Sequence, residues 1–207
     1  MKNTTYPGSK NIPPKKIRSN TENIRKITYL ALLTAVVLIF QTLGSFIRLG
    51  PFQASLVLIP IVIGAALLGV TAGGWLGFVF GMHVLLSGDA ALFLTIDFFG
   101  TILVVLLKGI LCGMTAGLVF KLLKKFNTYV AVLVSAIACP VVNTGIFLLG
   151  CRIFFLEAVS AWASAEGMSV TAYMFLILVG GNFIFELVLN IIFVPVILRL
   201  IRIGKRN

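Results

Sequence analysis

Apolar residues gather along the chain into long runs, separated by short polar or glycine-containing breaks. The runs cover residues 27–47, 52–68, 72–86, 98–123, 130–149 and 173–203. A helix that crosses the hydrocarbon core of a bilayer needs about 20 mostly apolar residues. The pattern therefore predicts an all-α integral membrane protein with six transmembrane helices.

The second and third runs are short for a membrane span, and Pro60 interrupts the second. They could together form one buried helix with a re-entrant piece. Two helices are favoured, because the segment 69–71 (Gly-Val-Thr) offers a turn between them and because an even number of spans fits the distribution of charge.

Basic residues mark one side of the predicted membrane domain. Seven lie in residues 1–26, three more are Lys121, Lys124 and Lys125, and four follow residue 198, so fourteen of the 17 lie on one side. Lys and Arg next to span ends remain in the cytoplasm. Both termini are thus predicted to be cytoplasmic, with a flexible basic arm at 1–23, a membrane domain at 24–203 and a short tail at 204–207. A helix is expected to begin near Asn23.

The composition supports this interpretation and changes the meaning of the net charge. Apolar residues make up 59% of the 207 residues, charged residues only 11%, and the mean hydropathy is +1.10. A soluble domain of this size needs a more highly charged surface. The net charge of +11 is an orientation signal that can also attract anionic lipid heads, and no nucleic-acid partner is expected. The three cysteines have no paired spacing and imply neither a disulfide framework nor a metal site.

Polar side chains inside the apolar runs are the candidate functional residues. Asn182, Glu186 and Asn190 recur every four residues and share a helix face. Lys108 and Asn143 lie inside two other runs. Ionisable residues within a membrane usually face a cavity or a partner. The alternative is structural: Lys108 and Glu186 pair only to make each other tolerable, and the asparagines hold helices together.

Two further candidates lie near the ends of spans. His83 is equally well explained as a packing residue or as a ligand contact. Arg152 belongs to the outer connection 151–171, which is apolar enough to lie on the membrane or to cap a cavity. We expect an outward pocket between the fourth, fifth and sixth spans, roofed by this connection.

No catalytic constellation is present in the sequence. His83 is the only histidine, so it has no second histidine to act with, and no phosphate-binding GxxxxGK[ST] loop occurs. Neither an enzymatic activity nor a cofactor is predicted.

Small residues recur every four positions in the first, third and fourth runs. The glycine series, 69–81 and 109–117, favours close packing of helices inside the protein. Ala31 and Ala35 have the same spacing and could instead be a docking face for another membrane protein.

Several of these stretches have a familiar pattern. They are the AxxxA at 31–35, the run LVLIPIVIGAALLGVTAGGWLGFVFG at 56–81, PVVNTGIF at 140–147 and GGNFIFELVLN at 180–190. Over residues 24–203 the chain resembles the substrate-binding S components of energy-coupling factor (ECF) vitamin transporters, in the branch that includes pantothenate-type members.

The resemblance implies a vitamin-binding subunit of a bacterial plasma membrane. Such subunits bind a vitamin from outside and associate with a membrane T component and two cytosolic ATPases, and ATP hydrolysis is thought to topple them in the membrane. By this resemblance Ala31 and Ala35 would contact the T component, while Asn143, Asn182 and Glu186 would line the pocket. Lys108 and Arg152 are added on physical grounds, as cations for an anionic vitamin. The alternatives are a self-sufficient secondary transporter, for which no internal repeat is visible, and a membrane-embedded enzyme.

Overall fold

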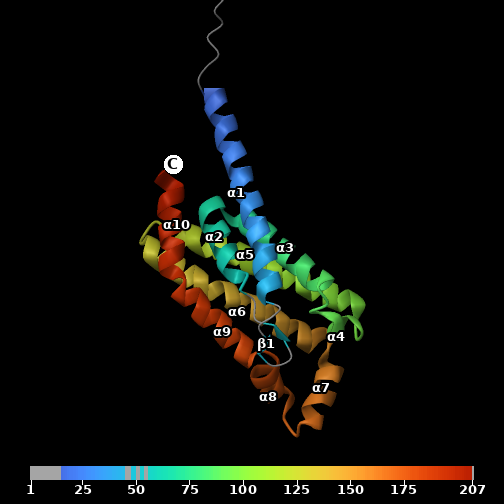
Figure 1. Ribbon diagram of the computed structural model, residues 1–207. Coiled ribbons are helices and arrows are strands. Elements are labelled where there is room, and N and C mark those ends of the chain that lie inside the picture. Colours follow the sequence, from blue (N-terminus) through green and yellow to red (C-terminus); the bar gives the residue numbers. More distant parts are fainter. Residues whose placement is uncertain (1–14, 45–47, 50–51, 54–55, 207) are drawn as a thin grey trace, which may run out of the picture.

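The computed structural model describes residues 15–44, 48–49, 52–53 and 56–206, and helices account for nearly all of them (Figure 1). In this part of the chain the strands are β1 (Arg48–Leu49) and β2 (Phe52–Gln53), which form one antiparallel pair. The predicted all-α fold is therefore confirmed. Residues 1–14 of the predicted arm lie outside the described residues.

Helix α1 (Lys15–Gly44) begins eight residues before the expected start at Asn23. The reason is local: after Pro14, neither proline nor glycine occurs until Gly44, and lysine, arginine and glutamate favour helix. Part of the segment expected to be a flexible arm is therefore a helical extension of the first apolar run.

Helices α2 (Leu58–Leu68) and α3 (Val70–Leu86) are separate, as expected, and only Gly69 lies between them. Gly69 has a φ of 102°, a region that disfavours residues with a Cβ atom. With 11 residues, α2 is about 17 Å long, well short of the hydrocarbon core. It is nevertheless the centre of the protein, because residues 58–65 are all buried and six helices pack against it. These are α1, α3, α5 (Phe98–Leu123), α6 (Thr128–Phe154), α9 (Gly180–Ile192) and α10 (Val194–Arg206).

Helices α5 (Phe98–Leu123) and α6 (Thr128–Phe154) are the long central pair. Each begins at a capping side chain. Asp97 accepts a hydrogen bond from the Gly100 amide at 2.9 Å, and Asn127 accepts one from the Tyr129 amide at 2.8 Å. Such caps pair amide groups that have no partner within the first helical turn. The short helix α4 (Ala91–Leu94) connects α3 to this pair.

The glycine series brings α3 and α5 together. A Cβ atom added at Gly77 would collide with the carbonyl oxygen of Gly109, and one added at Gly73 would collide with that of Gly113. The two backbones thus meet directly, as small-residue stripes permit in membrane proteins. This is the internal packing role expected for these glycines.

The connection expected at 151–171 is mostly helical. Helix α6 continues to Phe154, and α7 (Leu156–Ala165) and α8 (Val170–Ala172) follow. Phe155 and Val159 are buried in a second apolar core with Phe93, and Trp162 packs against it. Apolar residues at helical spacing explain why this segment folds against the protein.

The last apolar run is broken into three pieces. They are a π-helical segment (Tyr173–Leu178), α9 (Gly180–Ile192) and α10 (Val194–Arg206). The axes of α9 and the described part of α10 differ by 45°. Gly180 is required at the first break, because an added Cβ would lie 2.8 Å from the carbonyl oxygen of Phe175.

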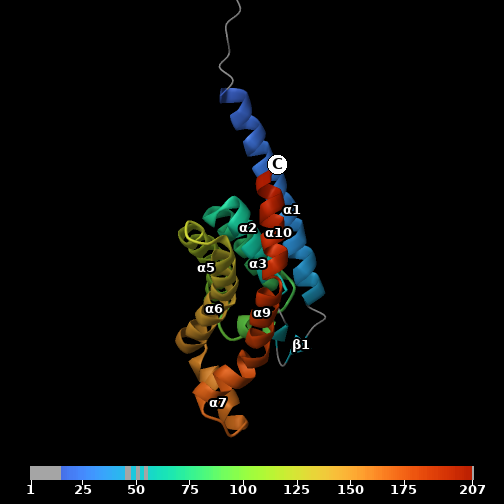
Figure 2. The same cartoon turned by 90° about the vertical axis from the view of Figure 1, so that its left-hand side faces the viewer.

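Within the described residues, three helices are long and apolar enough to cross a membrane, and up to five spans result if each bent helix pair counts as one. They are α1 from Glu22, α5 and α6, while α2 and α3 are shorter apolar helices. The start of α1 and the end of α10 lie at one end of the molecule, and α7 lies at the other (Figures 1 and 2). This arrangement fits an even number of crossings. The count of six and the cytoplasmic termini stay predictions.

Candidate binding cavity

A cavity opens in the half of the protein that is nearer to α4 and α7. Its empty volume is about 630 Å³, counting the part that is open to the surroundings. Five helices contribute to its wall, together with the residues at the break before α9 and the turn after α3. The lining residues are Gln41, Phe80, Val84, Asp89, Lys108, Asn143, Thr144, Phe147, Leu178, Val179, Asn182, Phe183 and Glu186.

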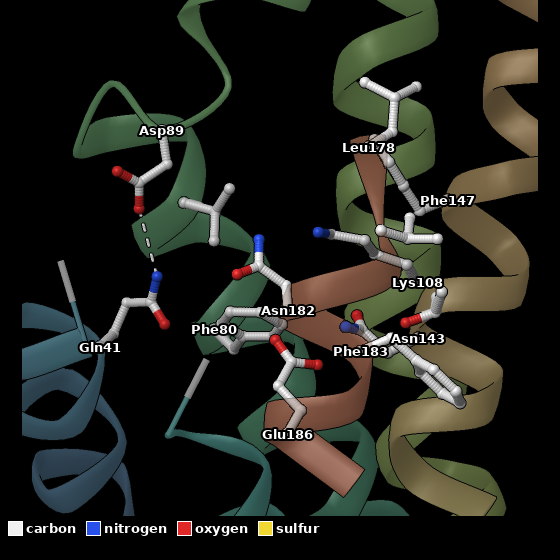
Figure 3. Close-up of a pocket in the computed structure, with 13 residues that line it drawn as sticks. Gln41, Phe80, Asp89, Lys108, Asn143, Phe147, Leu178, Asn182, Phe183 and Glu186 are labelled. Atoms are coloured by element: carbon white, nitrogen blue, oxygen red, sulfur yellow. Dashed lines mark hydrogen bonds between the residues drawn. The ribbon is translucent and has the colours of Figure 1, made fainter. Parts of the chain in front are cut away.

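Helix α9 provides one polar wall through Asn182 and Glu186 (Figure 3). They are four residues apart and thus project from the same side of the helix. Glu186 is only 5% exposed. The π-helical segment ends one turn earlier, so that Leu178 and Val179 close the apolar edge of the same wall.

Helix α6 provides the opposite polar side chain, Asn143, which is also 5% exposed. Pro140 lies three residues earlier inside the helix and cannot donate a backbone hydrogen bond. Thr144 and Phe147 follow on the same side and complete the contribution of α6. A polar amide and an aromatic ring therefore lie next to each other in this wall.

Lys108 enters the cavity from α5 (Figure 3). Its ammonium group lies 5.7 Å from the ring centroid of Phe80 and 5.5 Å from that of Phe147, within the range of cation–π interactions. Glu186 also interacts electrostatically with this ammonium group. Asp89 acts on it as well, and the rings and the two carboxylates offset part of the cost of burying a cation.

Gln41 and Asp89 form a second polar group at the cavity wall. The Gln41 side-chain amide donates a hydrogen bond to Asp89 Oδ2 at 3.2 Å, and this bond joins α1 to the turn after α3 (Figure 3). Neither residue was singled out from the sequence. Gln41 could have been identified as a candidate from the sequence, because its carboxamide lies inside the first apolar run. Phe80 and Phe147 could not, because a phenylalanine in a membrane segment is ordinary.

Several polar atoms of the cavity wall lack a partner. Among the described residues, no hydrogen bond reaches the buried side-chain carbonyl oxygens of Gln41, Asn143 and Asn182. A buried polar atom without a partner costs roughly 1–3 kcal/mol. A ligand with N–H or O–H groups would therefore gain affinity by bonding to them. Within the described part of the chain, no three His, Cys, Asp or Glu side chains are grouped as a metal site requires.

Three predicted site residues do not line this cavity. Arg152 is exposed near the end of α6. Asn190 is buried one turn beyond Glu186, and its side-chain amide donates to the Glu186 backbone carbonyl at 2.8 Å. His83 lies on α3 with its Nε2 3.4 Å from the hydroxyl of Thr42. Asn190 was proposed because it shares a helix face with Asn182 and Glu186, but one face of a helix can meet more than one environment.

The expected position of the pocket needs correction in two respects. Besides the fourth to sixth apolar runs, α1 and α3 also line it, through Gln41 and Phe80. The connection after α6 contributes no lining residue. Instead, Trp162 on α7 packs against Phe93 with ring centroids 6.0 Å apart, and Phe93 packs against Phe147 of the wall at 5.5 Å. Helix α7 thus supports the cavity from behind.

Ala31 and Ala35 are both exposed on α1. They lie outside the cavity, and their small side chains leave the backbone of α1 open to close approach. This position is compatible with contact to a second membrane protein.

Replacing Asn143 or Asn182 by leucine is expected to weaken ligand binding at least tenfold, or about 1.4 kcal/mol. Each change removes a hydrogen-bonding group from the cavity wall and keeps a side chain of similar size. The measurement is calorimetry with the ligand that co-purifies with the protein. Arg152→Gln is the control, because Arg152 is exposed outside the cavity. Unchanged affinity in both asparagine variants would show that the ligand binds elsewhere.

The geometry agrees with the result of comparison with known protein families. The family model for the substrate-specific component of ECF transporters matches residues 25–201, nearly the whole described chain. The chain therefore belongs to this family and is a multi-pass protein of the cell membrane. A comparison with curated proteins gives no match.

Proposed function

We propose that this protein captures a vitamin from outside the cell for import driven by partner ATPases. The observation that carries the proposal is the meeting of Lys108, Asn143, Asn182 and Glu186, from three different helices, in one cavity of an ECF substrate-specific component. The polar groups would orient the vitamin, and the phenylalanine rings would cover its apolar parts.

A secondary transporter is the rival proposal, and transport assays separate the two. In proteoliposomes the protein alone should bind its ligand but accumulate none, because it depends on a T component and two ATPases for release. Accumulation by the chain alone, driven by an ion gradient, would overturn the proposal. Mass spectrometry of small molecules that co-purify with the protein would identify the vitamin.

Bulky residues at Ala31 and Ala35 should stop transport and leave binding intact. We propose that these alanines meet the T component, since close helix contact depends on small side chains. In the double variant Ala31→Leu/Ala35→Leu, uptake by the reconstituted complex is expected to fall at least tenfold. The affinity of the isolated subunit should stay within twofold of the original. A double variant that co-purifies with its T component and transports normally would place the docking face elsewhere.

Pantothenate, a small hydroxylated carboxylate, is the vitamin that we propose. Its anion would meet Lys108, and its amide and hydroxyl groups would meet the asparagines. The carboxylates of Glu186 and Asp89 also line the cavity, so the ligand anion depends on Lys108 for a favourable contact. Arg152, the other proposed cation, is exposed outside the cavity.

Competition between pantothenate and its neutral alcohol analogue tests this choice. Pantothenate is expected to bind at least tenfold more tightly, because only its carboxylate carries the negative charge that forms an ion pair with the ammonium group of Lys108. Equal binding of the two, or tight binding of a cationic vitamin, would refute the argument from charge. The proposed transport function would still stand, because it does not depend on the identity of the vitamin.

A further inference from the structure

A second hollow lies at the other end of the protein, between α1, α2 and α10. Its empty volume is about 1420 Å³, counting the open part, and it shares no lining residue with the cavity described above. We call it the inner groove. Its lining residues are Glu22, Arg25, Lys26, Tyr29, Leu32, Leu33, Ile63, Leu67, Leu68, Leu200 and Ile203.

The inner groove is polar at one end and apolar along the rest. On α1 the polar residues lie between Glu22 and Tyr29, and the apolar wall continues to Leu33. From Glu22 to Leu33 the helix rises about 16 Å, close to the ~15 Å depth of one leaflet of a bilayer. This pattern matches a molecule with one polar head and a long apolar tail.

The polar end of the groove carries an excess of positive charge. Arg25 and Lys26 line it, and Arg25 is held 5.5 Å from the ring centroid of Tyr29. Glu22 is the only acid among the lining residues. The predicted topology places this end at the cytoplasmic surface, where anionic lipids attract basic residues.

The groove is also separate from the proposed docking face. At 100° per residue, Ala31 and Ala35 point roughly 140° away from the mean direction of the groove residues on α1. A partner that contacts the alanines therefore does not need to enter the groove. Helix α2 forms its floor, through Ile63, Leu67 and Leu68, and α1 and α10 both pack against α2 (Figure 2).

From these observations we infer that the inner groove is a binding site for an anionic phospholipid. The acyl chain lies along Leu33, Leu67 and Leu200, and the phosphate-bearing head contacts Arg25 and Lys26. A lipid held there would fill the space between α1 and α10 and stabilise their separation at the cytoplasmic end.

Photo-crosslinking tests this inference in the full chain. Leu200 is replaced by the photoreactive residue p-benzoylphenylalanine, and the protein is reconstituted in vesicles of equal parts phosphatidylglycerol and phosphatidylcholine. Leu118 on α5, replaced in the same way, is the reference; it is 49% exposed and lies one turn before Lys121, outside the groove. Adducts at position 200 are expected to be enriched in phosphatidylglycerol at least fivefold over those at position 118.

Charge removal then locates the head of the lipid. In the Leu200 background, Arg25→Gln/Lys26→Gln should reduce the enrichment to the reference value. Lys124→Gln/Lys125→Gln removes as much charge from another cytoplasmic segment and should leave the enrichment unchanged. The inference would be overturned if the ratio of phosphatidylglycerol to phosphatidylcholine adducts were the same at positions 200 and 118. It would also be overturned if Lys124→Gln/Lys125→Gln lowered the enrichment as much as Arg25→Gln/Lys26→Gln. A protein adduct in place of lipid adducts in cell membranes would overturn it as well, since the occupant would then be a partner.

Discussion

Gly77→Ala is expected to lower the stability of the protein by about 1–3 kcal/mol, the usual cost of overpacking a tight interface. The added methyl group would collide with the carbonyl oxygen of Gly109, which belongs to the backbone of α5 and cannot rotate away as a side chain would. The two helices must therefore separate. The measurement is the midpoint of thermal or denaturant unfolding in detergent.

Gly145→Ala provides a matched control for this prediction. Gly145 also lies inside a helix, but an added Cβ would meet nothing within 4 Å. Because alanine favours helix more than glycine by about 1 kcal/mol, this variant should be as stable as the original or slightly more stable. Equal destabilisation of both variants would mean that the loss comes from the helix itself and not from the contact between α3 and α5.

Glu186→Leu is expected to weaken ligand binding at least 100-fold, because a carboxylate that can accept hydrogen bonds from the ligand's hydroxyl groups is lost, and to destabilise the protein. The variant removes a buried carboxylate from the cavity and leaves Asp89 as the carboxylate that acts on the ammonium group of Lys108. Calorimetry and unfolding measurements on the same preparation give the two quantities separately.

The double variant Lys108→Leu/Glu186→Leu decides whether these residues serve binding or only structure. It removes both charges, so most of the lost stability should return. Binding should stay at least 100-fold weaker, because the cavity has lost two of its three charged side chains and only Asp89 is left. If the double variant binds the ligand as the original protein does, the two charges only make each other tolerable inside the membrane.

The sequence predicts the helices well where one physical signal dominates. The runs at 98–123 and 130–149 are long and apolar, and they correspond closely to α5 and α6. The start of α1 and the helical α7 were missed for a shared reason. Both segments mix polar and apolar residues, so that their helix propensity and packing outweigh the hydropathy signal.

The candidate site was predictable only in part. Asn143, Asn182 and Glu186 attract attention because polar groups are costly in a membrane, and all three line the cavity. His83 and Asn190 are costly in the same way but lie outside it. Sequence spacing predicts which residues share a helix face, but it does not predict which other helix packs against that face. Asp89 could not be placed, because its role depends on a turn that brings it to Gln41.

The cavity draws its walls from distant parts of the chain, and this has a consequence for biosynthesis. Lys108 leaves the ribosome with α5, long before Glu186 emerges with α9. A lysine at the centre of a membrane helix costs about 2.5–3.5 kcal/mol on insertion scales, and during this interval the carboxylate of Glu186 has not yet been made. Until Glu186 is made, the favourable transfer free energy of the apolar residues in α5 must be large enough to insert the lysine into the membrane. A nascent chain that stops before α9 therefore holds an unfinished site, and ligand binding reports that the last helix has been inserted.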